Sequence, residues 1–146
     1  MRSALSRIVL GSALAAWPAL IGCTANIHDN TVSIPNANVQ LNTSANVNNV
    51  KPGQPLPLQV KADSVFLVPP SATPPPEHMS DAGHFQFYFD NVDSTPILIT
   101  ADVSVTVTIP MDAKDGDHKV ICRLHKHDGM PTNVTSEVKI KVKVLT

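Results

Sequence analysis

The fold class is decided by the stretch Val134-Thr135-Ser136-Glu137-Val138-Lys139-Ile140-Lys141-Val142-Lys143-Val144. Its apolar residues stand at every second position, and the intervening residues are polar or charged. A period of two is the signature of a half-buried strand, which turns one face to a core and the other to water. No segment beyond residue 23 has the period of an amphipathic helix. The stretch therefore predicts an all-β domain.

The same alternation occurs at several places upstream. Asp102–Ile109 carries valines at alternate positions, and three phenylalanines share one face of the strand that follows Gly83. Leu56, Leu58 and Val60 alternate with polar residues and prolines. Turn residues separate these runs roughly every ten residues, which is typical of an antiparallel β-sandwich. We expect an immunoglobulin-like sandwich of about seven strands.

Two resemblances accompany this pattern. The first covers Ile109-Pro110, Asp115-Gly116-Asp117-His118-Lys119-Val120, Asp128-Gly129 and Val138–Val144, which resemble the closing strands of bacterial immunoglobulin-like domains. The second covers Gly83-His84-Phe85-Gln86-Phe87-Tyr88-Phe89-Asp90, Gly116-Asp117-His118 and Ser136-Glu137. It is similar to a family of uncharacterised exported bacterial proteins with a Gly-His-x-His strand and a later Gly-x-His strand. Here Gln86 stands where that family has its second histidine, so the resemblance does not carry over a metal site.

The N-terminal residues indicate export. Met1–Gly22 has a basic start followed by an uncharged apolar run that is shorter than the roughly 20 residues of a membrane-spanning helix. Its end, Leu20-Ile21-Gly22-Cys23, resembles the bacterial lipobox, which implies that Cys23 is lipidated and becomes the mature N-terminus. The alternative is an ordinary signal peptide that contains a cysteine. By resemblance to the sorting rule of Gram-negative lipoproteins, Thr24 favours the outer membrane, on the side facing the periplasm.

Composition limits the partners. Loss of Arg2 and Arg7 with the signal lowers the net charge from −1 to −3, which excludes the basic surface of a nucleic-acid-binding protein. We therefore expect the membrane, through the lipid anchor, and an envelope protein as partners, but no nucleic acid. We divide the chain into a signal peptide (1–22), an Asn-rich tether (23–49) and the sandwich (50–146). Within the tether, Thr31–Ile34 and Asn38–Leu41 alternate weakly, as edge strands would.

Three histidines form a candidate metal site. His125 and His127 are two residues apart and would share one face of a strand. In an immunoglobulin-like fold their strand pairs with the one that begins at His84, which brings the three imidazoles together on the outer, solvated face. Such a group would bind copper or zinc, with Asp128 as a further ligand. The alternative is that three polar residues simply occupy a solvated face, where Arg123 and Lys126 would repel a cation.

Cys122 is the remaining cysteine once Cys23 is lipidated. It shares its strand face with Val120 and Leu124, so we expect it in the core as a small apolar residue. The sequence contains no nucleophile elbow, and the chain has only two glutamates, which argues against an enzyme. The leading interpretation is an envelope-anchored, non-enzymatic binding or accessory module. The alternative is a periplasmic copper- or zinc-binding lipoprotein.

Overall fold

The structure, a computed structural model, describes residues 31–144. The expected signal peptide and Cys23 lie outside the described residues. Within these residues, eight strands follow one another: β1 (Asn38–Asn42), β2 (Pro55–Asp63), β3 (Phe66–Leu67), β4 (Ala82–Phe89), β5 (Leu98–Thr100), β6 (Ser104–Thr108), β7 (Gly116–Lys126) and β8 (Pro131–Val142). A single 3₁₀ turn (Pro76–His78) precedes β4. Within the described part of the chain, no helix is long and apolar enough to cross a membrane.

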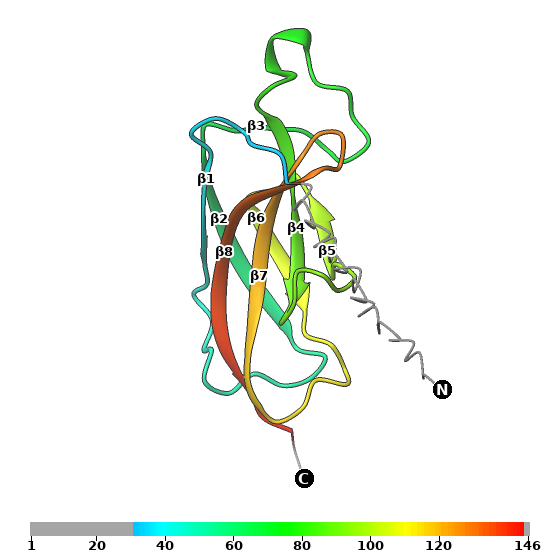
Figure 1. Cartoon of the computed structure of the whole chain (residues 1–146). Helices are drawn as coiled ribbons and strands as arrows, with labels where there is room; N and C mark the ends of the chain where they lie inside the picture. Colours follow the sequence, from blue (N-terminus) through cyan, green and yellow to red (C-terminus); the bar gives the residue numbers. More distant parts are fainter. Residues whose placement is uncertain (1–30, 145–146) are drawn as a thin grey trace, which may run out of the picture.

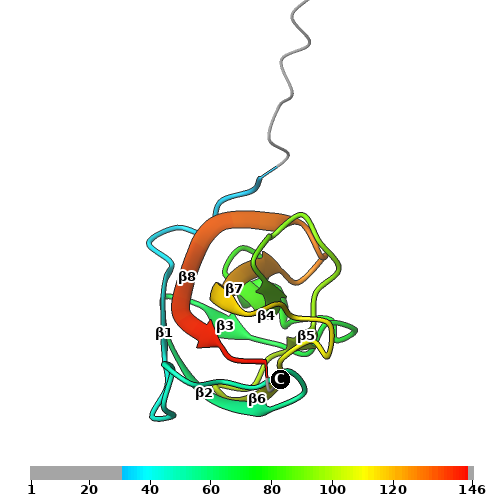
Figure 2. The ribbon, with the colours of Figure 1, turned by 90° about the horizontal axis from the view of Figure 1, so that it is seen from below.

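The strands form two sheets that face each other (Figures 1 and 2). One sheet has the order β1-β2-β6, and the other has the order β3-β4-β7-β8, with β5 also paired to β4. Every pairing is antiparallel except the two-residue pairing of β3 with β4. The prediction of an all-β, immunoglobulin-like sandwich is confirmed, and the strand beyond the expected seven is β1, which lies in the segment assigned to the tether.

The core lies between the sheets and is built from the alternating residues. β2 contributes Leu56, Leu58 and Val60, all of them buried in one apolar cluster. The opposing residues of this cluster come from β4 and β7: Phe85, Phe87, Val120, Cys122 and Leu124. On β8 the same alternation buries Ile140 and Val142 and leaves the intervening lysines exposed. The inward faces are therefore those that the sequence predicted.

Pro57 lies inside β2, where a missing N–H group would normally break a ladder. The carbonyl oxygen of Pro57 accepts a hydrogen bond from Thr43 Oγ1 at 2.6 Å, so its backbone faces the side where β1 has already ended. The backbone groups of the neighbouring Leu56 and Leu58 therefore face β6. The proline is tolerated because no strand partner needs its N–H group.

The prediction of a tether is wrong for residues 32–49. β1 pairs with β2 over five residues, and Ile34, Val39 and Leu41 are buried in the core. Val32 and Val50 also form bridges to β8. The alternative of an edge strand at Asn38–Leu41 is confirmed by β1.

The asparagines of this region have local structural roles instead. Asn36 adopts a positive φ of 58°, which asparagine tolerates better than most residues. The side chain of Asn46 accepts a hydrogen bond from the backbone N–H of Asn48. Asparagines thus occupy turns and the exposed positions of β1, between the buried residues of this segment, which explains why its composition resembled a tether.

We predict that Leu41→Ala lowers the free energy of unfolding by about 2–5 kcal/mol, because it leaves a cavity in the core. Gln40→Ala is the matched control, since Gln40 is the exposed neighbour on the same strand and its loss should change stability by less than about 0.5 kcal/mol. Urea denaturation followed by circular dichroism measures both. Equal, small effects would mean that β1 is not part of the cooperative fold.

Candidate functional site

The histidine pair of the predicted site lies on the outer side of the β4–β7 pairing. His84 and His125 stand directly opposite each other, with ring centroids 6.0 Å apart and ring planes inclined by 25°. The pairing of these two strands thus brings the two imidazoles together as the sequence predicted.

The pair is not solvated, however. His84 is only 2% exposed and His125 only 6%, and Tyr88 on the same face is also buried. The expectation of an exposed histidine face is therefore wrong for these two residues. The pairing of β7 with β8 shifts its register between Arg123 and His125, next to this pair.

Two contacts hold His125 in place. Its Nδ1 lies 3.0 Å from the carbonyl oxygen of Gly129, which accepts a hydrogen bond from it. The hydroxyl of Tyr88 lies 3.2 Å from its Nε2 and 2.7 Å from Oε1 of Gln86. His125 is thus fixed between the hairpin and β4.

His84 is held differently. Its Nδ1 is buried and has no hydrogen-bond partner among residues 31–144. Burying an imidazole nitrogen without a partner is unfavourable, so this atom is the unsatisfied point of the site. Neighbouring Gly83 cannot be replaced without movement, because an added Cβ would lie against the carbonyl oxygen of His125.

Burial also governs the charge of the pair. Desolvation lowers the pKa of His84, and the imidazole of His125 lowers it further against the opposing effect of Asp128. Desolvation lowers the pKa of His125 as well, with the Gly129 carbonyl opposing and Arg123 assisting. The lowered pKa values favour the neutral form of both rings.

His127 does not join the pair in a strand. β7 ends at Lys126, and His127 lies half-buried in the hairpin turn, where its backbone N–H donates to the carbonyl oxygen of Ala82. The alternation that placed His127 beside His125 holds only within a strand. Among the described residues, no group of three or more His, Cys, Asp or Glu side chains is arranged to hold a metal ion.

A second histidine site, not foreseen from the sequence, lies at the other end of β4. Nδ1 of His118 lies 2.6 Å from Oδ2 of Asp90, and its Nε2 lies 2.9 Å from the carbonyl oxygen of Lys114. Both neighbours are acceptors, so a doubly protonated ring satisfies both contacts. The ring also stacks on Phe89, with centroids 4.9 Å apart.

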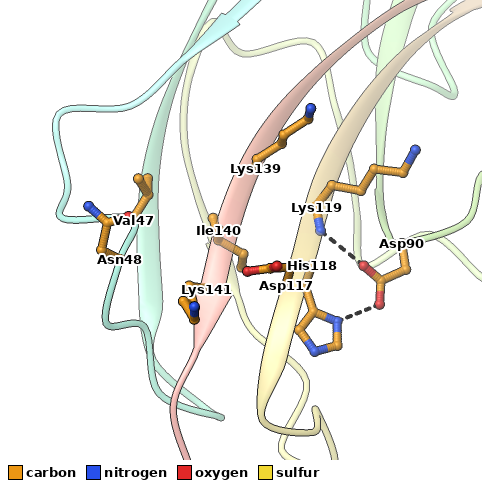
Figure 3. A pocket seen from close by; sticks show the side chains of 9 residues that line it. All are labelled: Val47, Asn48, Asp90, Asp117, His118, Lys119, Lys139, Ile140 and Lys141. Atoms are coloured by element: carbon orange, nitrogen blue, oxygen red, sulfur yellow. Dashed lines mark hydrogen bonds and ion pairs between the residues drawn. The ribbon is translucent and has the colours of Figure 1, made fainter.

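The charges at this end favour the protonated ring. Burial alone would lower the pKa of His118, but the hydrogen bonds to Asp90 and to the Lys114 carbonyl, together with the charges of Asp90 and Asp117, raise it overall. Asp90 also accepts a hydrogen bond from the backbone N–H of Lys119 (Figure 3). Strand pairing would have revealed this site, because Phe89 stands opposite Val120 and so brings Asp90 near His118.

An open hollow of about 670 Å³ lies beside this ion pair on the outer face of β7 and β8 (Figure 3). Its lining includes three lysines, but Lys119 is paired with Glu137 at 3.1 Å. The hollow also contains the carboxylates of Asp90 and Asp117. Such a mixture of side chains of both charges is typical of a solvated sheet face.

Cys122 lies in the core, as its position beside Val120 and Leu124 predicted. It is a buried free cysteine, and burial raises the pKa of its thiol to about 12. A thiol with such a pKa carries almost no thiolate at neutral pH and is unreactive.

The two histidine sites predict opposite dependences of stability on pH. The folded pKa values of His84 and His125 lie below the ordinary 6.5, so the stability they confer is present above pH 6.5 and is lost as the pH falls toward the folded values. The folded pKa of His118 is raised, so its contribution is present below pH 6.5 and is lost as the pH rises through the folded value.

The variants His84→Gln and His118→Gln separate the two effects in urea denaturation at several pH values. His84→Gln should weaken the loss of stability on acidification. His118→Gln should cost on the order of 1 kcal/mol at about pH 6, and less as the pH rises. The same pH profile in both variants and the parent chain would show that neither histidine is perturbed by folding.

Comparison with known proteins gives little further information. No family model matches the chain, and no curated protein matches it. Among solved structures, the chain is similar to the one described as "Structures of Clostridium thermocellum CbhA fibronectin(III)-like modules". That likeness has a TM-score of 0.43 and 17% sequence identity, and it covers 74% of this chain and 99% of the other.

Proposed function

We propose that this chain is an envelope-anchored, non-enzymatic binding module. The lipobox-like Leu20–Cys23 supports the anchor, which would place the sandwich at the membrane surface. The contact surface is the end of the sandwich formed by the loop Pro69–Pro76 and the hairpin between β7 and β8.

The observation that carries this proposal is a projecting loop fixed at both ends. The loop Pro69–Pro76 contains five prolines and extends beyond the sheets (Figure 1). On one side of it, β3 pairs with β4. On the other, His78 stacks on Phe66 with ring centroids 3.9 Å apart, and its Nδ1 lies within hydrogen-bond distance of Asp81, 3.2 Å from Oδ1.

A loop of this kind suits partner binding. Proline residues have few accessible backbone conformations, so a proline-rich loop loses little conformational entropy when a partner binds to it. Binding residues on β-sandwiches are commonly carried by loops at one end of a rigid scaffold. Here the scaffold beneath the loop is the fully paired start of β4.

The same end exposes two flexible apolar side chains. Met79 follows the proline-rich loop and is 43% exposed, and Met130 of the hairpin is 37% exposed. The hairpin is tied to the start of β4 by the hydrogen bond from His127 to Ala82, so both methionines belong to this end (Figure 1). Unbranched methionine side chains adapt to a partner surface.

The environments of the reactive groups argue against an enzyme. The thiol of Cys122 is buried and has a raised pKa. His84 and His125 are covered, and His118 is engaged in an ion pair with Asp90. A catalytic nucleophile or base needs access to its substrate, which the buried Cys122, His84 and His125 lack.

The test is chemical crosslinking in intact envelopes. The double variant Met79→Asp/Met130→Asp should reduce crosslinking to a specific envelope protein by at least about tenfold, because charges replace apolar contacts. Met111→Asp is the matched control, since Met111 is 79% exposed but lies in the loop between β6 and β7 at the opposite end (Figure 1).

Cys23→Ser provides the second control, because without its lipid the chain should leave the membrane fraction. Retention of this variant in the membrane would refute the proposed anchor. An unchanged crosslinking pattern in the double methionine variant would refute the proposed contact surface.

Binding of copper or zinc is the second candidate function, and the observation that favours it is the His84–His125 pair. The lowered pKa values of both imidazoles favour the neutral form that binds a metal, and Nδ1 of His84 has no hydrogen-bond partner among the described residues. The burial of the pair and the charge of Arg123 count against it.

Calorimetric titration with Cu²⁺ or Zn²⁺ decides this second candidate. Binding at the pair would be lost in His84→Gln and in His125→Gln. The variant His127→Gln shows whether the third histidine of the predicted site contributes, because a ligand's removal should weaken binding by about tenfold or more. No uptake of either ion at micromolar concentration would eliminate the candidate.

A further inference from the structure

The two lateral edges of the sandwich differ. On one edge β1 lies against β8, where the backbone N–H of Leu41 donates to Ser136 Oγ at 2.9 Å. Bridges from Val32 and Val50 to β8 close the same edge at two further points. On the other edge, within residues 31–144, β6 pairs with β2 alone. One side of β6 is therefore without a strand neighbour in this part of the chain.

The direction of the β6 backbone follows from its hydrogen bonds to β2. The N–H of Val60 donates to the carbonyl oxygen of Val103 at 2.7 Å, and the N–H of Ile109 donates to that of Gln54 at 3.0 Å. The backbone N–H and C=O groups of every second residue from Val103 to Ile109 therefore face β2. The residues between them direct their N–H and C=O groups away from β2. These outward-facing residues are Ser104, Thr106 and Thr108, and all three are exposed.

The edge also lacks the usual protection against strand pairing. Natural edge strands commonly carry lysine, proline or a bulge, which prevents another strand from adding to them. β6 reads Ser-Val-Thr-Val-Thr and has none of these. The edge strand β8, in contrast, carries Lys139 and Lys141 as well as its covering segments. The backbone of β6 thus offers N–H and C=O groups to an added strand, and its side chains do not prevent such a strand from pairing.

We propose that β6 pairs antiparallel with β6 of a second copy of this chain, around a two-fold axis at Thr106. This register sets Thr106 opposite its own copy and Ser104 opposite Thr108, and such hydroxyl pairs across strands are favourable. The two three-stranded sheets then become one continuous sheet. This inference goes beyond the proposed partner binding, which uses the end of the sandwich.

Charge favours a second copy as the occupant. No charged residue occurs between Val103 and Ile109, so no like charges meet along the paired strands. In the same register Asp102 of one copy lies opposite the uncharged Pro110 of the other. The strand is self-complementary, as a two-fold interface requires.

The interface is small. Beside the strand, the exposed apolar residues are Val103, which is 45% exposed, and Ile99 on β5, which is 44% exposed. A single strand pairing with few flanking contacts belongs to the weak class of interfaces. We therefore expect a reversible dimer that forms at high local concentration.

Sedimentation equilibrium of the whole chain, in a density-matched mild detergent, measures the association. The parent chain should pass from monomer to dimer between about 10 µM and 1 mM, as a weak interface does. Thr106→Pro removes an N–H group that faces the copy and leaves the bonds to β2 intact. Thr106→Lys sets two like charges opposite each other at the axis.

Both substitutions should lower the association constant at least about tenfold, because each substitution occurs twice in the two-fold interface, once in each copy. Thr135→Lys is the matched control: Thr135 is an exposed threonine on β8, away from this edge, and its association should equal that of the parent. Circular dichroism verifies that each variant is folded. If Thr106→Pro does not fold, Thr106→Lys alone tests whether β6 forms the dimer.

A parent chain that stays monomeric throughout this range would overturn the proposal, even where the edge binds a strand of another protein. A dimer that persists equally in the folded Thr106 variants would overturn it too. Loss of the dimer in these variants, with its retention in Thr135→Lys, is the supporting result.

Discussion

β4 and β7 pair over seven residues, from Gly83 opposite Lys126 to Phe89 opposite Val120, and the other features of the molecule depend on this pairing. Its inner side joins the phenylalanines of β4 to Cys122 and Leu124, which are the centre of the core. Its outer side joins His84 to His125, and its far end brings Asp90 to His118. One strand pairing thus fixes the core and both histidine sites.

The two ends of this pairing treat histidine in opposite ways. At the hairpin end the rings are covered and lose hydration, which disfavours the imidazolium. At the other end a carboxylate and a carbonyl oxygen both accept from the ring, which favours the imidazolium in spite of its burial. The groups in contact with each histidine ring therefore determine whether it is charged, and its location on the sheet does not.

Much of the fold was predictable because it rests on local alternation. The faces of β2, β4, β7 and β8 follow from residues such as Leu56, Phe87 and Ile140, and their pairing followed from the sandwich topology. Strand parity and pairing also predicted that His84 would lie beside His125. These properties need only the period of a strand and the order of strands in a sheet.

The remaining features depend on contacts that have no period in the sequence. His84 and His125 are buried because the outer sheet face is covered at this point. His127 lies in the turn because β7 ends at the residue before it. The segment of β1 was assigned to a tether because its two buried residues, Val39 and Leu41, lie among asparagines, although its weak alternation indicated an edge strand. Where a loop or a short strand decides the environment, composition alone misleads.

Residue-by-residue amide hydrogen exchange tests the central role of the β4–β7 pairing most directly. At neutral pH the amides of Phe85, Phe87 and Cys122 should exchange only through global unfolding, and so should be the slowest in the domain. Amides of the projecting loop, such as those of Ser71 and Thr73, should exchange many orders of magnitude faster. Exchange of the β4 and β7 amides at the rate of this loop would contradict the account.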